Sequence, residues 1–405
     1  MSIKRLDELT IGMVLASDLK AEDGRPLFMA GIELGERHIE LLKRVGVKEI
    51  DVEASVLDLS EETLREVEDY VRDFFLYVDP DFPPCIEMFK IALDLTAQAV
   101  ADGWDLPDPS QRRAENVEHM EDLFTKGMGS PDTIVKHETE LSSFPDIYFR
   151  IREILEDESA SADRIAQVVG TDMSLSAKLL KLVNSPFYGF PQSIDSISRA
   201  VALVGAKELS TLALGISAIN YFKDIPPELV DMKSFWRHSI TCGILAKVLA
   251  GTQTGLSPER FFIAGLLHDV GQLIMYKKLP YASTEAMLFA RENSIPLVEA
   301  ERSIIGFCHT DISKPLLESW QFPEGLSNMV NYHHNPMEFP NPLEPAIIHV
   351  ADTLSNAVEI SQGGMYVLPD LDPDAWELLG IDPSALDGAV AEYQKQIDII
   401  INAFF

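Results

Sequence analysis

From about residue 141 to residue 360, apolar residues recur at intervals of three and four, and this spacing constrains the fold more than any other feature. It puts the apolar side chains on one face of an α-helix. Nothing in this stretch alternates with the period of two that a half-buried strand requires. We therefore predict an all-α domain for residues 141–360. Two of its helix faces are formed by Ile147, Ile151, Ile154 and Leu155, and by Leu175, Leu179, Leu182 and Val183.

The rest of the chain is divided by its turn signals and its composition. Residues 1–55 are predicted to form a small β-rich module with one helix, because Asp23-Gly24 separates two short strand-like runs as in a hairpin. Residues 56–140 are predicted to be a helical connector. Residues 361–405 open with an acidic, turn-rich linker and end in helical segments. The predicted fold class is therefore mainly α, with an all-helical bundle preceded by the β-rich module.

Charge and composition exclude several classes of protein. The chain of 405 residues carries 65 acidic and 33 basic residues, which gives a net charge of −32. Such a surface repels phosphate backbones, so we expect no direct binding of nucleic acid. Three scattered cysteines fit a reducing cytoplasm. We expect no membrane insertion, because Lys207 and Glu208 interrupt the longest apolar stretch.

A series of histidines and aspartates is set into the apolar, helical part of the chain. Six of the 9 histidines lie between residues 238 and 349. Any one of them is ordinarily a hydrogen-bonded core or surface residue, but an ordered series on one helical domain favours a metal site. The series consists of His238, His268, Asp269, His309, His333, His334, His349 and Asp352.

These residue types suit a divalent metal. Imidazole and carboxylate groups are ligands for Fe, Mn, Zn or Ni. Few protein ligands for each ion leave positions open for water, as catalysis requires. The adjacent His268 and Asp269 can act as neighbouring ligands at a helix end, which we expect Gly271 to mark. The predicted metal ligands are His238, His268, Asp269, His309, His333, His334 and Asp352.

The order of these residues resembles the ligand pattern of the HD superfamily of metal-dependent phosphohydrolases. The closer resemblance, over residues 141–360, is to the HDOD family, the HD-related output domain of bacterial signalling proteins. It implies a helical regulatory domain with little demonstrated catalysis. The segments that carry it are TDMSLSAKLLKLVNSPFYG (171–189), SISRAVALVGAKEL (196–209), FWRHS (235–239), AGLLHDVGQL (264–273) and GFCHTDISKPLLESWQFPEGLSNMVNYHHNP (306–336).

The chain departs from the more distantly similar HD-GYP enzymes, which degrade a cyclic dinucleotide with a metal cluster. Those enzymes have a glutamate one turn before the first histidine, where this chain has Ser234. They have a lysine three residues after the aspartate, where this chain has Gln272. Their Gly-Tyr-Pro loop is missing, because the sequence after His334 reads NPMEFPNPLEP.

Two functions are compatible with this pattern. We favour a bacterial signal-transduction or regulatory protein whose HDOD domain binds a signalling protein or a small-molecule ligand, with a bound metal and without robust catalysis. The alternative is a metal-dependent phosphohydrolase or cyclic-dinucleotide phosphodiesterase. A homodimer is compatible with the apolar stripes of the connector.

One loop offers a candidate surface for a protein partner. The segment VNSPFYGFPQSIDS joins two predicted helices and supplies Phe187, Tyr188 and Phe190. Aromatic side chains commonly anchor protein interfaces, and they also pack between helices. The packing role is narrowly favoured, and partner binding is the functional alternative.

Overall fold

The chain forms two compact units in a computed structural model. The N-terminal unit comprises Met1–Val71 and Leu93–Asp108, and the C-terminal unit comprises Arg72–Ala92 and Pro109–Phe405. The structure describes residues 2–5, 14–16, 19–20, 26–29, 31–32, 34–45, 47, 49–52, 59–107, 130–132, 134–135, 150–151, 153, 162–185, 188–222, 225, 230–360 and 367–404.

Short strands and one helix make up the first part of the N-terminal unit. Strand β1 (Ser2–Arg5) pairs antiparallel with β4 (Glu49–Val52). Strand β2 (Leu19–Lys20) pairs antiparallel with β3 (Pro26–Phe28). The helix α1 (Glu36–Val45) has 10 residues, whereas no described strand is longer than 4. The prediction of a β-rich module is therefore not supported.

The core of this part explains why strands do not dominate it. Its fully buried members are Leu15, Leu34, Leu42 and Ile50. Leu42 comes from α1, Ile50 from β4, and the other two from residues outside the four strands. The apolar contacts that stabilise this core are thus made by the helix and the connecting segments as much as by the sheets.

Two longer helices follow. Helix α2 (Glu61–Arg72) begins after Ser60, whose hydroxyl oxygen accepts a hydrogen bond from the backbone N–H of Thr63 at 3.0 Å. This is an ordinary N-cap. Helix α3 (Pro83–Ala101) starts with two prolines, which are tolerated in the first turn because its N–H groups lack helical partners.

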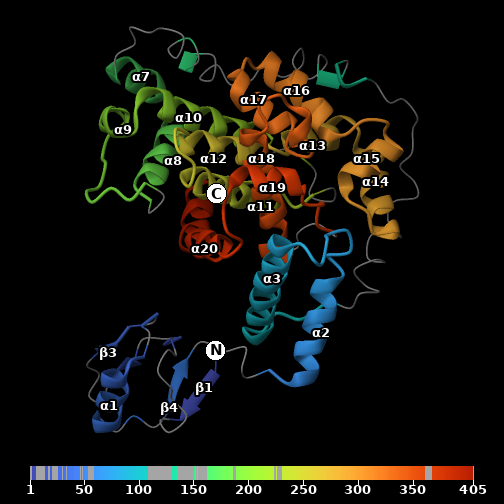
Figure 1. The fold of residues 1–405 in the computed structure, drawn as a ribbon. Helices are drawn as coiled ribbons and strands as arrows, with labels where there is room; N and C mark the ends of the chain where they lie inside the picture. Colours follow the sequence, from blue (N-terminus) through green and yellow to red (C-terminus); the bar gives the residue numbers. More distant parts are fainter. Residues whose placement is uncertain are drawn as a thin grey trace. The chain divides into compact units, whose positions relative to one another are not determined.

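The C-terminal unit consists of helices (Figure 1). No strand occurs among the described residues after β4, so the mainly α fold predicted from the periodicity is confirmed. None of the described helices has both the length and the apolar composition needed to cross a membrane. The helices are α7 (Ala162–Val169), α8 (Met173–Val183), α9 (Ile197–Val204), α10 (Ala206–Tyr221), α11 (Met232–Gly251), α12 (Pro258–Leu267), α13 (Val270–Lys278), α14 (Pro280–Asn293), α15 (Leu297–Ile304), α16 (His309–Ser319), α17 (Glu324–Asn331), the 3-10 helix η2 (Pro336–Glu338), α18 (Leu343–Val358), α19 (Pro373–Leu379) and α20 (Ala385–Phe404).

Helices α11 and α18 lie in the middle of the C-terminal unit and contact each other (Figure 1). Every residue of α18 from Pro345 to Val358 is buried. A helix that is buried on all sides belongs to the core of a large domain. Helix α11 also packs against α12 and α20. Any polar side chain on α11 or α18 is therefore held in a fixed environment.

Candidate metal centre

Close packing of α11 against α12 brings the first predicted ligand towards the His-Asp pair. A Cβ atom added to Gly265 would lie 2.6 Å from the Cα atom of Gly243. Only glycine permits this approach, because a real Cβ atom at that distance would clash. His238 lies on α11 and His268 follows α12, so the glycine contact helps to set the distance between their rings. The two ring centroids are 5.2 Å apart.

His268 and Asp269 lie at the junction between two helices. His268 caps the C-terminus of α12, and Asp269 precedes the first residue of α13. The Asp269 side chain makes no capping hydrogen bond, which leaves both of its oxygens facing the histidines. Our prediction that Gly271 ends the helix is wrong, because Gly271 lies in the first turn of α13.

Gly271 instead allows α13 to approach α16. A Cβ atom at this position would collide with the carbonyl oxygen of His309. The Gly271 N–H donates to the Ser313 hydroxyl at 3.1 Å, and that hydroxyl donates to the His309 carbonyl at 3.0 Å. This contact holds His309, the first residue of α16, beside Asp269.

One set of predicted ligands surrounds the Oδ2 side of Asp269. His268 Nε2 lies 3.3 Å from Asp269 Oδ2 and 3.4 Å from Asp352 Oδ1. His238 Nε2 lies 3.3 Å from Asp352 Oδ1 and 4.0 Å from Asp269 Oδ2. Two imidazoles and two carboxylates therefore face one another within the protein interior.

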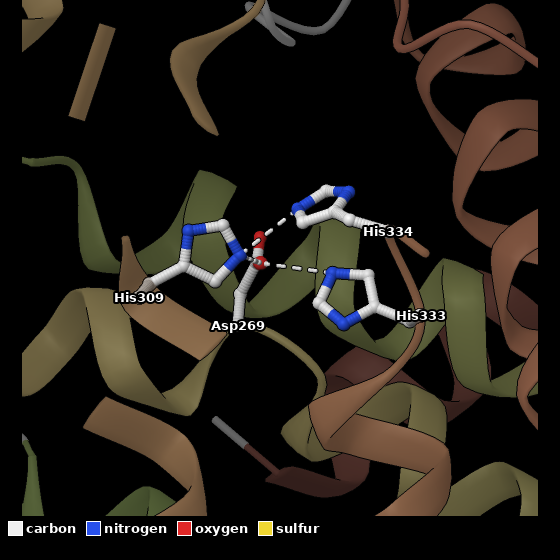
Figure 2. Close-up of side chains that lie close together, drawn as sticks. All are labelled: Asp269, His309, His333 and His334. Carbon is white, nitrogen blue, oxygen red and sulfur yellow. Dashed lines mark hydrogen bonds and ion pairs between the residues drawn. The ribbon is translucent and has the colours of Figure 1, made fainter. Parts of the chain in front are cut away.

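A second set surrounds the Oδ1 side of the same carboxylate. His309 Nε2 lies 3.2 Å from Asp269 Oδ1, and His333 Nε2 lies 3.9 Å from it. His334 Nε2 lies 3.0 Å from His309 Nε2. Figure 2 shows the three rings arranged around the Asp269 side chain. Asp269 thus belongs to both sets, with one oxygen towards each.

The outer nitrogens of three rings are fixed by hydrogen bonds. The Nδ1 atoms of His268 and His333 lie 2.7 Å from the carbonyl oxygens of Gly265 and Val330, so each Nδ1–H donates. The Nδ1 atom of His309 lies 2.7 Å from a carboxylate oxygen of Glu301. Fixing Nδ1 in this way orients Nε2 towards the centre, as is usual for metal-binding histidines.

The charges in this cluster shift the pKa values in opposite directions. Burial lowers the pKa of His268, but Asp269, Cys242 and Asp352 together outweigh burial and hold that pKa well above its usual value. Glu301 and Asp269 do the same for His309. Burial raises the pKa of Asp269, but His268 and His309 outweigh it and hold that pKa well below its usual value.

The remaining members of the cluster follow the same physical rules. Burial and then the charge of His268 lower the pKa of His333 to about 3. Burial lowers the pKa of His334 too, and His333 and His309 add to the effect. Burial raises the pKa of Asp352, but the neighbouring imidazoles of His238 and His268 hold it well below its usual range. The cluster therefore keeps its carboxylates charged and His333 and His334 neutral, as metal ligands must be, whereas His268 and His309 would each release a proton on binding a metal.

Two buried nitrogens in the cluster test whether a cation fits. His268 Nε2 and His333 Nε2 have no partner with hydrogen-bond geometry among the described residues. Buried polar atoms without partners are rare in folded proteins and require an explanation. Ligand atoms lie within 4.8 Å of one another in each of three combinations that could hold an ion: Asp269 with His309, His333 and His334; His238 with His268 and Asp269; and His268 with His333 and Asp352. The residues present therefore fit a metal.

His349, the sixth histidine of the series, lies outside this cluster. Its Nδ1–H donates to the His333 carbonyl oxygen at 2.8 Å, and its Nε2 accepts from the Asp372 N–H at 3.0 Å. Both nitrogens are thus used. His349 supports the backbone that carries His333.

Ser234 and Gln272, which replace residues of the HD-GYP pattern, have structural partners. The Ser234 hydroxyl donates to the Asp231 carboxylate at 2.6 Å, and Asp231 also accepts from the backbone N–H groups of Lys233 and Ser234. Ser234 is therefore part of the N-terminal cap of α11. The Gln272 side-chain oxygen accepts from the Tyr276 hydroxyl at 3.0 Å.

Two buried glutamates at the cluster were not among the site residues predicted from the sequence. Glu301 contacts His309, and Glu359 Oε2 lies 3.9 Å from His238 Nδ1. Glu359 Oε1 also accepts from the Thr241 hydroxyl at 2.7 Å, and burial raises the pKa of this carboxyl group. The spacing of residues indicated that Glu301 is buried, because it follows Leu297 by four residues and so lies on the apolar face of its helix.

A small cavity lies against the ligand cluster and has a volume of about 10 Å³. One part of its wall consists of predicted ligands, and the other part is mostly apolar. Lys and Arg are absent from the described part of the lining, which consists of His238, Asp269, Gln272, Pro296, Leu297, Val298, His309, His334, Asp352 and Pro369.

The aromatic loop lies between α8 and α9. Tyr188 and Phe190 stack with ring centroids 5.9 Å apart, and Lys247 Nζ lies 4.9 Å from the Tyr188 ring centroid. Both aromatic residues are partly buried. Phe187, the third residue predicted for partner binding, lies outside the described residues.

Comparisons with known proteins point to one family. The HDOD domain matches residues 141–336. An uncharacterized protein of Treponema pallidum (strain Nichols) is 27% identical over 217 residues, which cover 52% of this chain and 41% of that protein. The chain thus spans less than half the length of this relative.

Solved structures share the fold. An HDOD domain protein of unknown function from Geobacter sulfurreducens has a TM-score of 0.54 at 23% identity, covering 67% of this chain and 98% of that one. A protein from Marinobacter aquaeolei VT8, named "Putative signal transduction protein", has a TM-score of 0.54 at 16% identity, covering 100% of this chain and 96% of that one. Residues 141–336 of this chain are therefore an HDOD domain, and these solved structures share its fold.

Proposed function

We propose that this protein is a bacterial signalling or regulatory protein whose HDOD domain binds a divalent metal and acts as a binding or output module. The observation that carries the proposal is the convergence of Nε2 atoms and carboxylates on both sides of Asp269. The proposed ligands are His238, His268, Asp269, His309, His333, His334 and Asp352, and the proposed metals are Fe, Mn, Zn or Ni.

The position of Asp269 supports a centre with two metal ions. Its Oδ2 faces His238 and His268, and its Oδ1 faces His309 and His333. A carboxylate that offers one oxygen to each of two ions is a common bridge in two-metal sites. When bound, such ions supply Lewis acidity and a coordinated water molecule. The protein's own part is to orient the imidazoles through Gly265, Val330 and Glu301.

The output would be a change in binding to a signalling protein or a small molecule. The proposed partner surface is the aromatic loop with Phe187, Tyr188 and Phe190. The signalling role is supported by the HDOD match and by the whole-chain likeness to the Marinobacter protein named for signal transduction. A homodimer and a cytoplasmic location complete the proposal.

A metal-dependent phosphohydrolase or cyclic-dinucleotide phosphodiesterase is the alternative. The two-sided ligand set favours it, because two-metal sites hydrolyse phosphate esters. The cavity at the centre opposes it, because no Lys or Arg among the described lining residues adds to the positive charge that the metal ions would offer a phosphoryl group. We therefore favour the non-enzymatic function.

Metal analysis tests the proposal. Protein purified without chelators and then supplied with Mn, Fe or Zn is expected to hold stoichiometric metal. His268→Ala and Asp269→Ala should each lose it, because direct ligands dominate affinity. His38→Ala is the matched control, since His38 lies in the N-terminal unit and hydrogen-bonds there to the Gly35 N–H. Wild-type protein without stoichiometric metal would contradict the proposal and leave a hydrogen-bonded polar core.

A further inference from the structure

We infer that the metal centre accepts only ligands of one or two non-hydrogen atoms, and that Leu297 and Val298 impose this limit. The inference rests on the proposed function and deepens it by naming the class of ligand. That class comprises water, hydroxide and neutral diatomic molecules that bind directly to a metal ion.

The size of the cavity is the first argument. Its volume is about 10 Å³, measured as the space open to the centre of a water-sized sphere. A site needs roughly 10–15 Å³ on that measure to hold one water molecule. A phosphate ester, with its shell of oxygens around phosphorus, is much larger. The cavity therefore has room beside the predicted ligands for a single small molecule.

The position of the wall is the second argument. Leu297 and Val298 form the start of α15, and Pro296 immediately precedes that helix. Leu297 and Glu301 are four residues apart, so they share one face of α15. Glu301 is held at the centre by its contacts with His309 at 2.7 and 3.0 Å. The carboxylate that orients His309 thus also places Leu297 over the cavity.

The wall is a packed part of the protein. Leu297 is 8% exposed, and Pro296 and Pro369 are buried. Helix α15 packs along α14. Proline fixes its own φ angle, and at Pro296 φ is −56°. Moving the wall to admit a larger ligand would disrupt these contacts, so the limit on size is built into the described structure.

Charge is the third argument. The carboxylates of Asp269 and Asp352 line the cavity. No Lys or Arg stands among the residues of the lining that the structure describes, and the Gln272 oxygen accepts a hydrogen bond from Tyr276. A multiply charged anion would therefore meet these carboxylates, and the metal ions would be the only cations beside it among the described residues. A neutral diatomic molecule or water avoids this repulsion.

Competition between a small and a bulky probe tests the inference. The full-length protein is loaded anaerobically with iron(II), and its iron content is measured first. Nitric oxide is the small probe, and its complex with iron is followed by absorption and electron paramagnetic resonance. Inorganic phosphate is the bulky probe. In wild type we expect nitric oxide to bind and phosphate to leave its affinity unchanged.

Shortening a side chain of the cavity wall should allow phosphate to compete with nitric oxide. In Leu297→Ala we expect phosphate to weaken nitric oxide binding about tenfold, which corresponds to about 1.4 kcal/mol. If Leu297→Ala fails to fold, Val298→Ala replaces it, because Val298 is partly exposed. Phosphate should weaken nitric oxide binding in this variant too. Ile304→Ala is the matched control, because Ile304 lies on the same helix and does not line the cavity.

The possible failures are distinguishable. A protein that binds no iron and none of the other proposed metals would overturn the proposed function, and the inference with it. A protein that binds iron but not nitric oxide would overturn the inference alone. Equal competition by phosphate in wild type, Leu297→Ala and Ile304→Ala would also overturn the inference alone.

Discussion

One oxygen of Glu301 contacts His309 twice. Glu301 Oε2 accepts from the His309 backbone N–H at 3.0 Å and lies 2.7 Å from its ring Nδ1. The backbone N–H belongs to the first turn of α16, where helices leave donors without internal partners. A single carboxylate thus fixes both the start of the helix and the orientation of the imidazole.

Replacing this carboxylate should weaken metal binding without removing a ligand. Glu301→Gln keeps the shape of the side chain and removes its charge. Partners that orient a ligand typically contribute about 10-fold to 100-fold in metal affinity, so we expect a loss of that size. Titration with a competing chelator measures it. Glu299→Gln, at an exposed residue of the same helix, is the control. Equal affinities in the two variants would show that Glu301 has no orienting role.

Gly271→Ala should be strongly destabilising. The added Cβ atom would collide with the His309 carbonyl oxygen and separate α13 from α16. Overpacking of this kind costs about 1–3 kcal/mol, and backbone contact puts the cost near the upper end. Gly388→Ala is the control, because a Cβ atom there meets nothing within 4 Å and should stabilise helix α20 by about 0.5–1 kcal/mol. Denaturant unfolding compares them, and similar stabilities would refute the proposed close contact.

Asp231 should stabilise α11 in a pH-dependent way. The hydrogen bond from the Ser234 hydroxyl lowers the pKa of Asp231 below 3.8. A carboxyl group whose pKa is lowered by folding stabilises the native state above its unfolded pKa, and this stabilisation is lost as the pH falls through the folded pKa. Asp231→Ala should therefore lower the free energy of unfolding by about 1 kcal/mol at neutral pH. The difference should shrink as the pH falls below 3.8.

Asp231→Asn separates charge from capping. Asparagine is a good N-cap and does not titrate, so most of the stability should be retained and should not depend on pH. Unfolding curves measured at several pH values provide the test. A loss in Asp231→Ala that stayed constant down to acid pH would show that the charge of Asp231 contributes nothing.

The aromatic loop can be tested for its two roles. The Asn184 side chain donates to the Ile194 carbonyl at 2.8 Å and accepts from its N–H at 2.6 Å, so it fixes the loop. Asn184→Ala should cost about 1–3 kcal/mol, because it leaves those backbone groups without partners. Tyr188→Ala should cost about 1 kcal/mol, from its contacts with Phe190 and Lys247, and should leave the protein folded.

Partner capture then decides between packing and recognition. If Tyr188→Ala stays folded and no longer captures a partner that wild type captures, the loop is a binding surface. If the folded variant captures that partner normally, the proposed role of the loop in recognition is wrong. Thermal unfolding of the same samples shows that a loss of capture does not come from a loss of structure.

Hydrolysis of cyclic dinucleotides should be absent or very slow, even with metal bound. Phosphoryl transfer needs positive charge where the transition state develops negative charge, and the described residues that line the cavity include no Lys or Arg. Turnover well below about 1 per second is expected. The double change Ser234→Glu with Gln272→Lys supplies the two missing groups of the HD-GYP pattern. Wild-type turnover at ordinary enzyme rates, abolished by His268→Ala, would establish the phosphodiesterase alternative.

Much of the fold follows from local sequence patterns. The helical nature of α8 follows from Leu175, Leu179, Leu182 and Val183, which are all buried on one face. Such a face depends only on the number of residues in a helical turn, which is the same in every helix. The prediction of a β-rich module for residues 1–55 used a hairpin signal instead, and it is not supported because α1 and the connecting segments supply much of the core.

The sequence by itself also determined which residue types are available to a metal, since His268, Asp269 and Asp352 stand in apolar helical contexts. Only the tertiary structure decided how they meet. It placed Glu301 against His309, removed His349 from the cluster and closed the cavity with Leu297. These outcomes depend on close contacts such as Gly271 against His309, between segments far apart in the chain. Helical periodicity specifies which face of a helix is buried, but the packing of different helices specifies what that face touches.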